Sequence, residues 1–199
     1  MGVVIGIIVA VVVVLLVLWL MLGYNGLVRA RNAFKNAFAQ IDVQLQRRFD
    51  LIPNLVETAK AYMAHERETL EAVTNARAAA ISGLNAAQQN PGDPVAMKKL
   101  ADSQGQLAGA LGRLNVAVEA YPDLKASQNM MQLSEELTST ENRVSFARQA
   151  YNDSVMSYNN RRQSFPGSLV AGMFGFDEAA QWEIAPDHPE TREAPKVQF

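Results

Sequence analysis

The 199-residue sequence contains no cysteine and only two histidines, His65 and His188. A chain without cysteine forms no disulfide, holds no zinc through thiolates and offers no thiol nucleophile. The two histidines lie far apart, and His65 lacks the second histidine that a His-Glu-x-x-His zinc helix requires. We therefore expect no metal, no cofactor and no metal-dependent hydrolysis.

The sequence also lacks motifs for phosphate binding. It has no Gly-x-x-x-x-Gly-Lys-Ser/Thr loop and no Gly-x-Gly-x-x-Gly after a predicted strand. With 18 Lys+Arg against 20 Asp+Glu, it has no excess of basic charge, so we expect no nucleic-acid partner. Its clusters of carboxylates are typical of a solvated helix face. These clusters comprise Glu66, Glu68, Glu71, Glu135 and Glu136. No pattern predicts an enzyme.

What the sequence does have is a long apolar run near its start. Val3 to Leu22 holds nineteen apolar side chains and one glycine, and no charged side chain precedes Arg29. At ~1.5 Å per residue, this stretch forms a helix of about 30 Å, the thickness of a bilayer's hydrocarbon core. The alternative, a cleaved signal peptide, needs a basic start and an Ala-x-Ala-like site, which are absent around Leu22. We predict a transmembrane anchor over residues 3–22.

The charges that flank this run predict its orientation. Arg29, Arg31 and Lys35 follow it closely, and no basic side chain precedes it. The positive-inside rule therefore places residues 23–199 in the cytoplasm, behind a single-pass anchor. Trp19 and Tyr24 lie where an aromatic belt is expected, at the end of the span.

Beyond residue 23, apolar residues recur at helical spacing. The first stripe predicts a helix from about Tyr24 to Asp50. We expect Pro53 to interrupt it, either in the first turn of a new helix capped by Asp50 or as a kink. The next helix extends to about Gln89, where Asn90-Pro91-Gly92 stops it.

Two further helices complete the predicted architecture. Asp93 as N-cap and Pro94 at the first helical position open the third. Its stripe has coiled-coil spacing with one polar member, and consists of Met97, Leu100, Gln104, Leu107, Leu111, Leu114 and Val118. Tyr121-Pro122 turns the chain into a fourth helix that ends near Ser164. The predicted class is all-α, an antiparallel up-and-down four-helix bundle over residues 23–165.

Residues 166–199 differ in composition from the rest. Their glycines and prolines predict an irregular tail. The tail is nevertheless too apolar for a solvated linker, because it contains Phe174, Phe176, Trp182 and Phe199. We expect it to dock, either on the helices of its own chain or on a neighbouring subunit.

A series of short strings extends in order from Tyr24 to Val197. The strings are Tyr24-Asn25-Gly26-Leu27-Val28, residues 44–57 with Arg47-Arg48-Phe49-Asp50-Leu51-Ile52-Pro53-Asn54, residues 119–125 with Tyr121-Pro122, Thr140-Glu141-Asn142-Arg143, Tyr151-Asn152, Tyr158-Asn159, Phe165-Pro166, Phe174-Gly175-Phe176 and Pro195-Lys196-Val197. In these strings the sequence resembles the LemA family of bacterial membrane proteins, with Phe38 where the family's tryptophan is expected. The resemblance implies a single-span anchor followed by a helical bundle in the bacterial inner membrane, and it supplies no reaction.

Several polar residues in these strings have two readings. Five of them are asparagines, which are poor helix formers. We expect their amides either to bond across helices or to a neighbouring chain, or to satisfy backbone groups at helix ends. They are Asn25, Asn54, Asn142, Asn152 and Asn159. The dibasic pair Arg47-Arg48 has two possible roles as well, attraction to lipid headgroups or interaction with helix ends and neighbouring carboxylates. We favour the interaction with helix ends and carboxylates.

The function predicted from these features and from the resemblance is a noncatalytic, membrane-anchored scaffold of the bacterial envelope. We expect it to contact lipid and to self-associate as a homo-oligomer through the faces of its helical bundle and through its tail. The alternative is a monomeric adaptor for a membrane protease or another envelope enzyme. The candidate structural or interaction residues are Tyr24, Asn25, Arg47, Arg48, Asp50, Pro53, Asn54, Tyr121, Pro122, Asn142, Arg143, Phe174, Phe176, Trp182 and Phe199.

Overall fold

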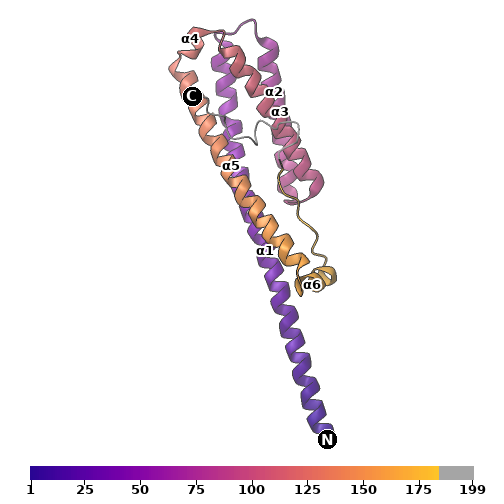
Figure 1. Cartoon of the computed structure of the whole chain (residues 1–199). Coiled ribbons are helices and arrows are strands. Elements are labelled where there is room, and N and C mark those ends of the chain that lie inside the picture. Colours follow the sequence, from indigo (N-terminus) through magenta and orange to yellow (C-terminus); the bar gives the residue numbers. More distant parts are fainter. Residues whose placement is uncertain (184–199) are drawn as a thin grey trace, which may run out of the picture.

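The computed structural model describes residues 1–183, which form six helices and no strand (Figure 1). The helices are α1 Gly2–Lys60, α2 Arg67–Gln89, α3 Pro94–Val118, α4 Pro122–Lys125, α5 Gln128–Gln163 and α6 Gly167–Phe174. The predicted all-α class is confirmed. α1 packs most extensively against α5, α2 packs against α3, and α2 also contacts α1.

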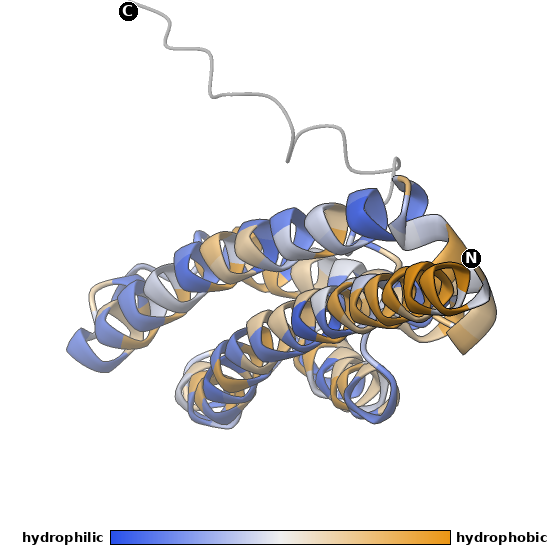
Figure 2. Ribbon diagram, turned by 90° about the horizontal axis from the view of Figure 1, so that it is seen from below, coloured by the Kyte–Doolittle hydropathy of each residue, from blue (hydrophilic) through white to orange (hydrophobic). Residues whose placement is uncertain are grey.

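The first third of α1 projects away from the other helices (Figure 1). Its most apolar 18-residue window has a mean hydropathy of 3.5, and none of that window is buried by the rest of the described chain. Viewed from this end, it is the most hydrophobic stretch of ribbon (Figure 2). In the described residues, one helix is thus long and apolar enough to cross a membrane.

The remainder of α1 forms the spine of the core. Its buried side chains recur every three or four residues from Leu27 to Ala59, as a helix with one apolar face requires. α5 lies along this face and runs in the opposite direction, from the end of the molecule near α4 back towards the anchor (Figure 1). α2 and α3 form a helical hairpin that covers the distal half.

The expectation that a new helix capped by Asp50 starts near Pro53 is wrong, because α1 continues through Pro53 to Lys60. The alternative, a kink at Pro53, stays a prediction. Proline has no N–H, so it leaves the carbonyl four residues earlier without its helical donor. That carbonyl belongs to Phe49, and the Nε of Arg77 on α2 donates a hydrogen bond to it at 2.7 Å. A side chain from a neighbouring helix thus replaces the missing backbone donor, and Asp50 is not a cap.

The first break in the helix comes later, between Lys60 and Arg67. The N–H groups of Tyr62 and Met63 both bond the carbonyl of Ala59, which tightens the last turn. Met63 is fully buried inside this connection. No glycine or proline marks the turn in the sequence, which is why a helix running from the Pro53 region to Gln89 was expected.

The start of α3 agrees with the prediction. The Asp93 carboxylate accepts a hydrogen bond from the Ala96 N–H at 2.8 Å, and Pro94 occupies the first turn. The predicted stripe is buried except for Leu111, which is half-buried. Gln104 is buried within it, and its side-chain amide has no partner among the described residues.

The tail is more regular than expected. Residues Gly167–Phe174 form α6, so the prediction of irregular structure is wrong there. A Cβ at Gly167 would lie only 2.0 Å from the Arg161 carbonyl oxygen, so the chain can turn this closely only with glycine. Gly175, at φ +66°, ends α6 in the left-handed region that favours glycine. Phe199 lies outside the described residues.

Candidate functional site

Residues 175–183, which we call the strap, extend from α6 back along the helices without regular secondary structure. Their apolar side chains point inward at intervals of three. Phe176, Ala179 and Trp182 are only 4%, 6% and 5% exposed. The strap therefore docks on the helices of its own chain, the first of the two expectations for the tail.

Two asparagines on α5 hold the strap by its backbone. The Asn159 amide donates to the Ala179 carbonyl at 2.8 Å and accepts from the Ala179 N–H at 3.1 Å. Asn152 does the same with Trp182, at 3.1 and 2.8 Å. Each side-chain amide thus pairs with both backbone groups of one residue, as a neighbouring β-strand would. Neither predicted role of these asparagines describes this arrangement.

The spacing of the two asparagines matches that of the strap. Seven residues along a helix span about 10.5 Å. Three residues of extended chain span about 10 Å. Positions 152 and 159 on α5 therefore align with positions 182 and 179 of a chain running in the opposite direction. The spacing of the two asparagines on α5 therefore fits an extended backbone.

The residue before each asparagine is a tyrosine that contributes a further bond. The Tyr158 hydroxyl donates to the Asp177 carbonyl and the Tyr151 hydroxyl to the Ala180 carbonyl, both at 2.7 Å. The Tyr-Asn pairs, residues 151–152 and 158–159, thus form a repeat in which each pair binds strap residues two apart. The same contact pattern recurs three residues along the strap.

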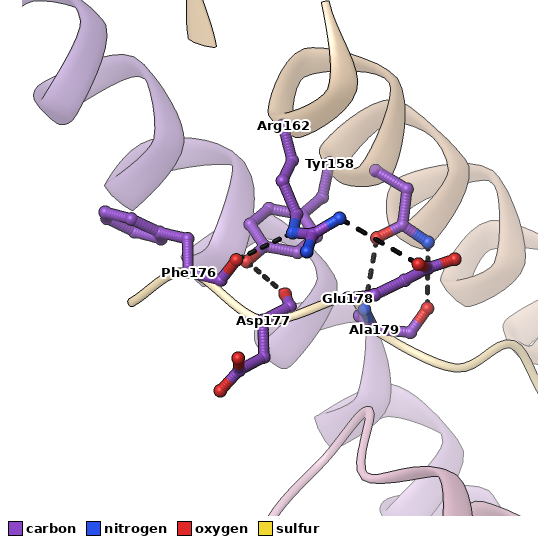
Figure 3. A network of polar contacts seen from close by, with 7 residues as sticks. Tyr158, Arg162, Phe176, Asp177, Glu178 and Ala179 are labelled. Atoms are coloured by element: carbon purple, nitrogen blue, oxygen red, sulfur yellow. Dashed lines mark hydrogen bonds and ion pairs between the residues drawn. The ribbon is translucent and has the colours of Figure 1, made fainter. Parts of the chain in front are cut away.

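Two more groups complete the polar contacts of the strap. The Nε of Arg162 donates to the Phe176 carbonyl at 2.6 Å, and its guanidinium lies 3.8 Å from the exposed Glu178 carboxylate (Figure 3). On the opposite side, the Gly92 carbonyl in the α2–α3 turn accepts from the Ala180 N–H at 2.8 Å. The strap therefore ties α5 to the α2–α3 hairpin.

Gly92 is required at this contact. Its φ of +94° lies in the region that favours glycine. A Cβ there would also lie 3.1 Å from the Cβ of Ala179 and 3.2 Å from the ring of Phe34. The Gly92 that stops a helix in the sequence also lets the strap approach the backbone of the turn.

Aromatic and cationic groups surround the two large strap side chains. The Tyr24 ring makes edge-on contacts with Phe174 and Phe176, with centroid distances of 5.0 and 5.5 Å. The guanidinium of Arg31 lies 5.0 Å from the Phe176 ring centroid, and that of Arg148 lies 5.9 Å from the Trp182 ring. These distances are within the range of cation–π attraction.

The surroundings keep the two tyrosines neutral. Burial raises the pKa of Tyr151 well above its ordinary value. Burial also raises the pKa of Tyr158, although the nearby Arg162 and Arg31 partly oppose it. A neutral phenol can donate a hydrogen bond to a carbonyl, whereas a phenolate cannot. Both phenols therefore stay protonated, and able to donate to the strap, up to a higher pH than an exposed tyrosine.

The structure brings together four of the predicted site residues, Tyr24, Phe174, Phe176 and Trp182, in or next to the strap. Arg48 lies elsewhere, buried on α1 and 3.9 Å from Glu141 of α5. Burial lowers the pKa of Arg48 and the Glu141 carboxylate partly offsets this. Tyr121 and Pro122 begin α4. The remaining predicted residues are exposed on the helices and form no common site, namely Asn25, Arg47, Asp50, Pro53, Asn54, Asn142 and Arg143.

Several residues that contact the strap were not among the predicted site residues, including Arg31, Tyr151, Tyr158 and Arg162. A signal was present, since the Tyr-Asn pair at residues 151–152 recurs seven residues later at 158–159. Chemically these side chains bind extended peptide backbone. Within residues 1–183, no group of three or more His, Cys, Asp or Glu side chains is arranged to hold a metal ion.

Comparison with known proteins adds one decisive observation. The sequence model of the LemA family matches residues 37–199. The chain belongs to the LemA family. A curated relative, Protein LemA of Metamycoplasma hominis, is 33% identical over 104 residues, which cover 52% of this chain and 43% of the relative. The chain thus aligns with less than half the length of that protein.

The strings that resemble the LemA family coincide with the strap contacts. Tyr151-Asn152 and Tyr158-Asn159 hold the backbone of the strap, and Phe174-Gly175-Phe176 contains the turn from α6 into it. The string that contains Pro53 also contains Phe49, whose carbonyl accepts a hydrogen bond from Arg77. These parts of the LemA resemblance therefore have a structural explanation in how segments distant in sequence are tied together.

Proposed function

We propose that this chain is a noncatalytic, membrane-anchored scaffold of the bacterial inner membrane, with residues 3–22 as a single transmembrane span. The observation that carries the proposal is the continuity of α1, which extends without interruption from an exposed apolar run into the buried core. A helix of 59 residues is about 88 Å long. The anchor and the helical domain therefore share one rigid element, which holds the domain at a set distance from the bilayer.

In this proposal α1, α2, α3 and α5 form an antiparallel bundle that lies in the cytoplasm. The orientation rests on Arg29, Arg31 and Lys35, which follow the apolar run. Protease added to sealed, right-side-out cells should leave the bundle intact. Digestion from outside would reverse the proposed orientation.

Self-association is proposed to occur through the faces of the helices. Phe146 on α5 is 73% exposed, and Met131 and Met156 on the same helix are 53% and 50% exposed. Because the anchors confine the chains to one membrane plane, many weak contacts of this kind would act together and raise the overall affinity. The strap gives no support to the predicted self-association through the tail, because its backbone and apolar groups already have partners in the same chain. That same observation favours the alternative, a monomeric adaptor for a membrane protease or another envelope enzyme.

The mass of the full chain in mild detergent, measured by light scattering over a dilution series, tests the proposal. A scaffold should form oligomers that dissociate on dilution. Phe146→Ser should lower the mass at a given concentration, whereas Gln149→Ser, a change at a nearby exposed polar position, should not. A uniform monomer at every concentration would reject the scaffold and leave the adaptor.

A further inference from the structure

We propose that α6, together with Phe165, is a second membrane contact that inserts its apolar side chains at the boundary between lipid headgroups and acyl chains. This inference rests on the proposed membrane anchor. It concerns a different segment, far from the anchor in sequence.

The sequence around α6 has no charge. The fourteen residues from Gln163 to Phe176 contain no Asp, Glu, Lys or Arg, between Arg162 on one side and Asp177 on the other. A solvated surface helix usually has a charged or polar outer face. The exposed positions of α6 carry no charge, and apart from Ser168 and Gly172 they are large and apolar.

α6 has an inner and an outer face, and apolar side chains lie on both. Val170 and Ala171 are buried against the other helices. On the other face Leu169, Met173 and Phe174 are 53%, 67% and 53% exposed, and the preceding Phe165 is 77% exposed. Four large apolar side chains on one short segment are thus left in contact with the surroundings.

The position of α6 identifies what covers this face. A Cβ at Gly23 would lie 3.0 Å from a methyl carbon of Val170, so α6 packs on α1 immediately after the apolar run ends at Leu22. The Phe165 ring lies 6.0 Å from that of Trp19, about one helical turn inside the run. α6 also lies beside α1 in this region in Figure 1. If the run spans a bilayer, α6 is at the level of the interface.

The neighbouring charges suit the same location. Arg29 is exposed on α1, about 10 Å beyond the end of the apolar run. Cations at this height face the phosphate groups of the lipids. A helix with an exposed apolar face can lie in a membrane interface, with its side chains reaching about 5–10 Å into it, and a cation such as Arg29 adds attraction to anionic lipid.

The experiment uses the full chain, whose lack of cysteine allows single labelling sites. Cysteine replaces Met173 on α6, Leu16 in the anchor or Val116 on α3, which is 74% exposed. Each carries an environment-sensitive nitrobenzoxadiazole label in vesicles of phosphatidylcholine and phosphatidylglycerol. Lipids with a shallow or a deep nitroxide group report contact with the bilayer, and iodide reports contact with water.

The proposal predicts that the shallow nitroxide quenches most of the emission at position 173 and that iodide has little effect there. The deep nitroxide should quench position 16, and iodide alone should quench position 116. Leu169→Ser in the chain labelled at 173 should reduce the lipid quenching while the same change in the chain labelled at 16 has no effect. Circular dichroism equal to that of the unlabelled chain confirms that each labelled variant is folded.

Other results would overturn the inference in distinguishable ways. If position 16 is quenched by lipid but position 173 behaves like position 116, the anchor stands and α6 faces water. If position 173 is shielded from both lipid and iodide, a second copy or another protein covers α6 instead of lipid. If position 16 is not quenched by lipid, the anchor itself is wrong and the inference fails with it.

Discussion

α6 and the strap follow one another in the chain, yet their apolar side chains have opposite surroundings. α6 leaves Leu169 and Met173 exposed, whereas the strap buries Phe176 and Trp182. α6 satisfies its backbone mainly within its own helix, whereas the strap depends on side chains of α5. Two consecutive segments of the tail, both rich in apolar side chains, are thus different elements: the strap packs on the helices of its own chain, and α6 leaves an apolar face exposed.

The largest expected difference between these elements is in stability. Trp182→Ala should lower the free energy of unfolding by about 3–5 kcal/mol, because it removes a large buried ring. Met173→Ala, at a side chain that is 67% exposed, should change it by about 0.5 kcal/mol or less. Denaturant unfolding of the full chain in mild detergent, followed by circular dichroism, measures both. Equal effects of the two substitutions would show that the strap and α6 contribute equally to stability, against this account.

The next effect concerns the backbone of the strap. Asn159→Ala should cost about 2–3 kcal/mol, because it leaves the N–H and carbonyl of Ala179 without their partners. Asn160→Ala is the matched control, since Asn160 is exposed on the same helix and makes the same gain in helix propensity. The same unfolding assay applies. A loss for Asn160→Ala as large as that for Asn159→Ala would show that the strap bonds contribute nothing.

A third segment sharpens the comparison, because α1 also has a backbone group satisfied by a distant side chain. Arg77→Met should cost about 1–2 kcal/mol by leaving the Phe49 carbonyl without a donor. In a Pro53→Ala background, residue 53 supplies the helical N–H, so the same change should cost less. A double-mutant cycle of unfolding free energies measures the difference. Full additivity would contradict the assigned role of Arg77.

The smallest expected effect is that of one hydroxyl group, and it depends on pH. Tyr151→Phe removes the bond to Ala180 and should cost about 1 kcal/mol at neutral pH. The native pKa of Tyr151 lies above its ordinary value. Above about pH 10 the unfolded chain therefore releases the phenolic proton while the native chain keeps it, and stability falls as the pH rises.

This loss with rising pH should be less steep in the Phe variant, because residue 151 no longer titrates. Unfolding of both proteins from pH 7 to about pH 11 gives the comparison. Parallel curves for the two proteins would show that Tyr151 is not buried in the native state.

Much of the helical architecture follows from the sequence. The Asp93-Pro94 start of α3 and the buried stripe from Met97 to Val118 were predictable, because local capping and helical periodicity determine them. The passage of α1 through Pro53 was not predictable. It depends on Arg77, which lies 24 residues away in the chain and reaches Phe49 only after α2 has packed.

The docking position of the strap also could not be predicted from the sequence alone. The apolar character of Phe176 and Trp182 predicted that the tail docks, since exposed rings of this size are costly. Where it docks depends on Asn152 and Asn159, whose partners lie 20 to 30 residues further along the chain. Side-chain amides can bond in many ways, so their role became clear only when the fold placed an extended backbone beside them.

The most direct test of the account is residue-resolved amide hydrogen exchange on the full chain in lipid nanodiscs. The central claim is that the strap is part of the folded domain, with the N–H groups of Ala179, Ala180 and Trp182 bonded to Asn159, Gly92 and Asn152. The account predicts that these three amides exchange about as slowly as those in the middle of α5. Exchange at the rate of an unstructured peptide, while α5 remains protected, would contradict it.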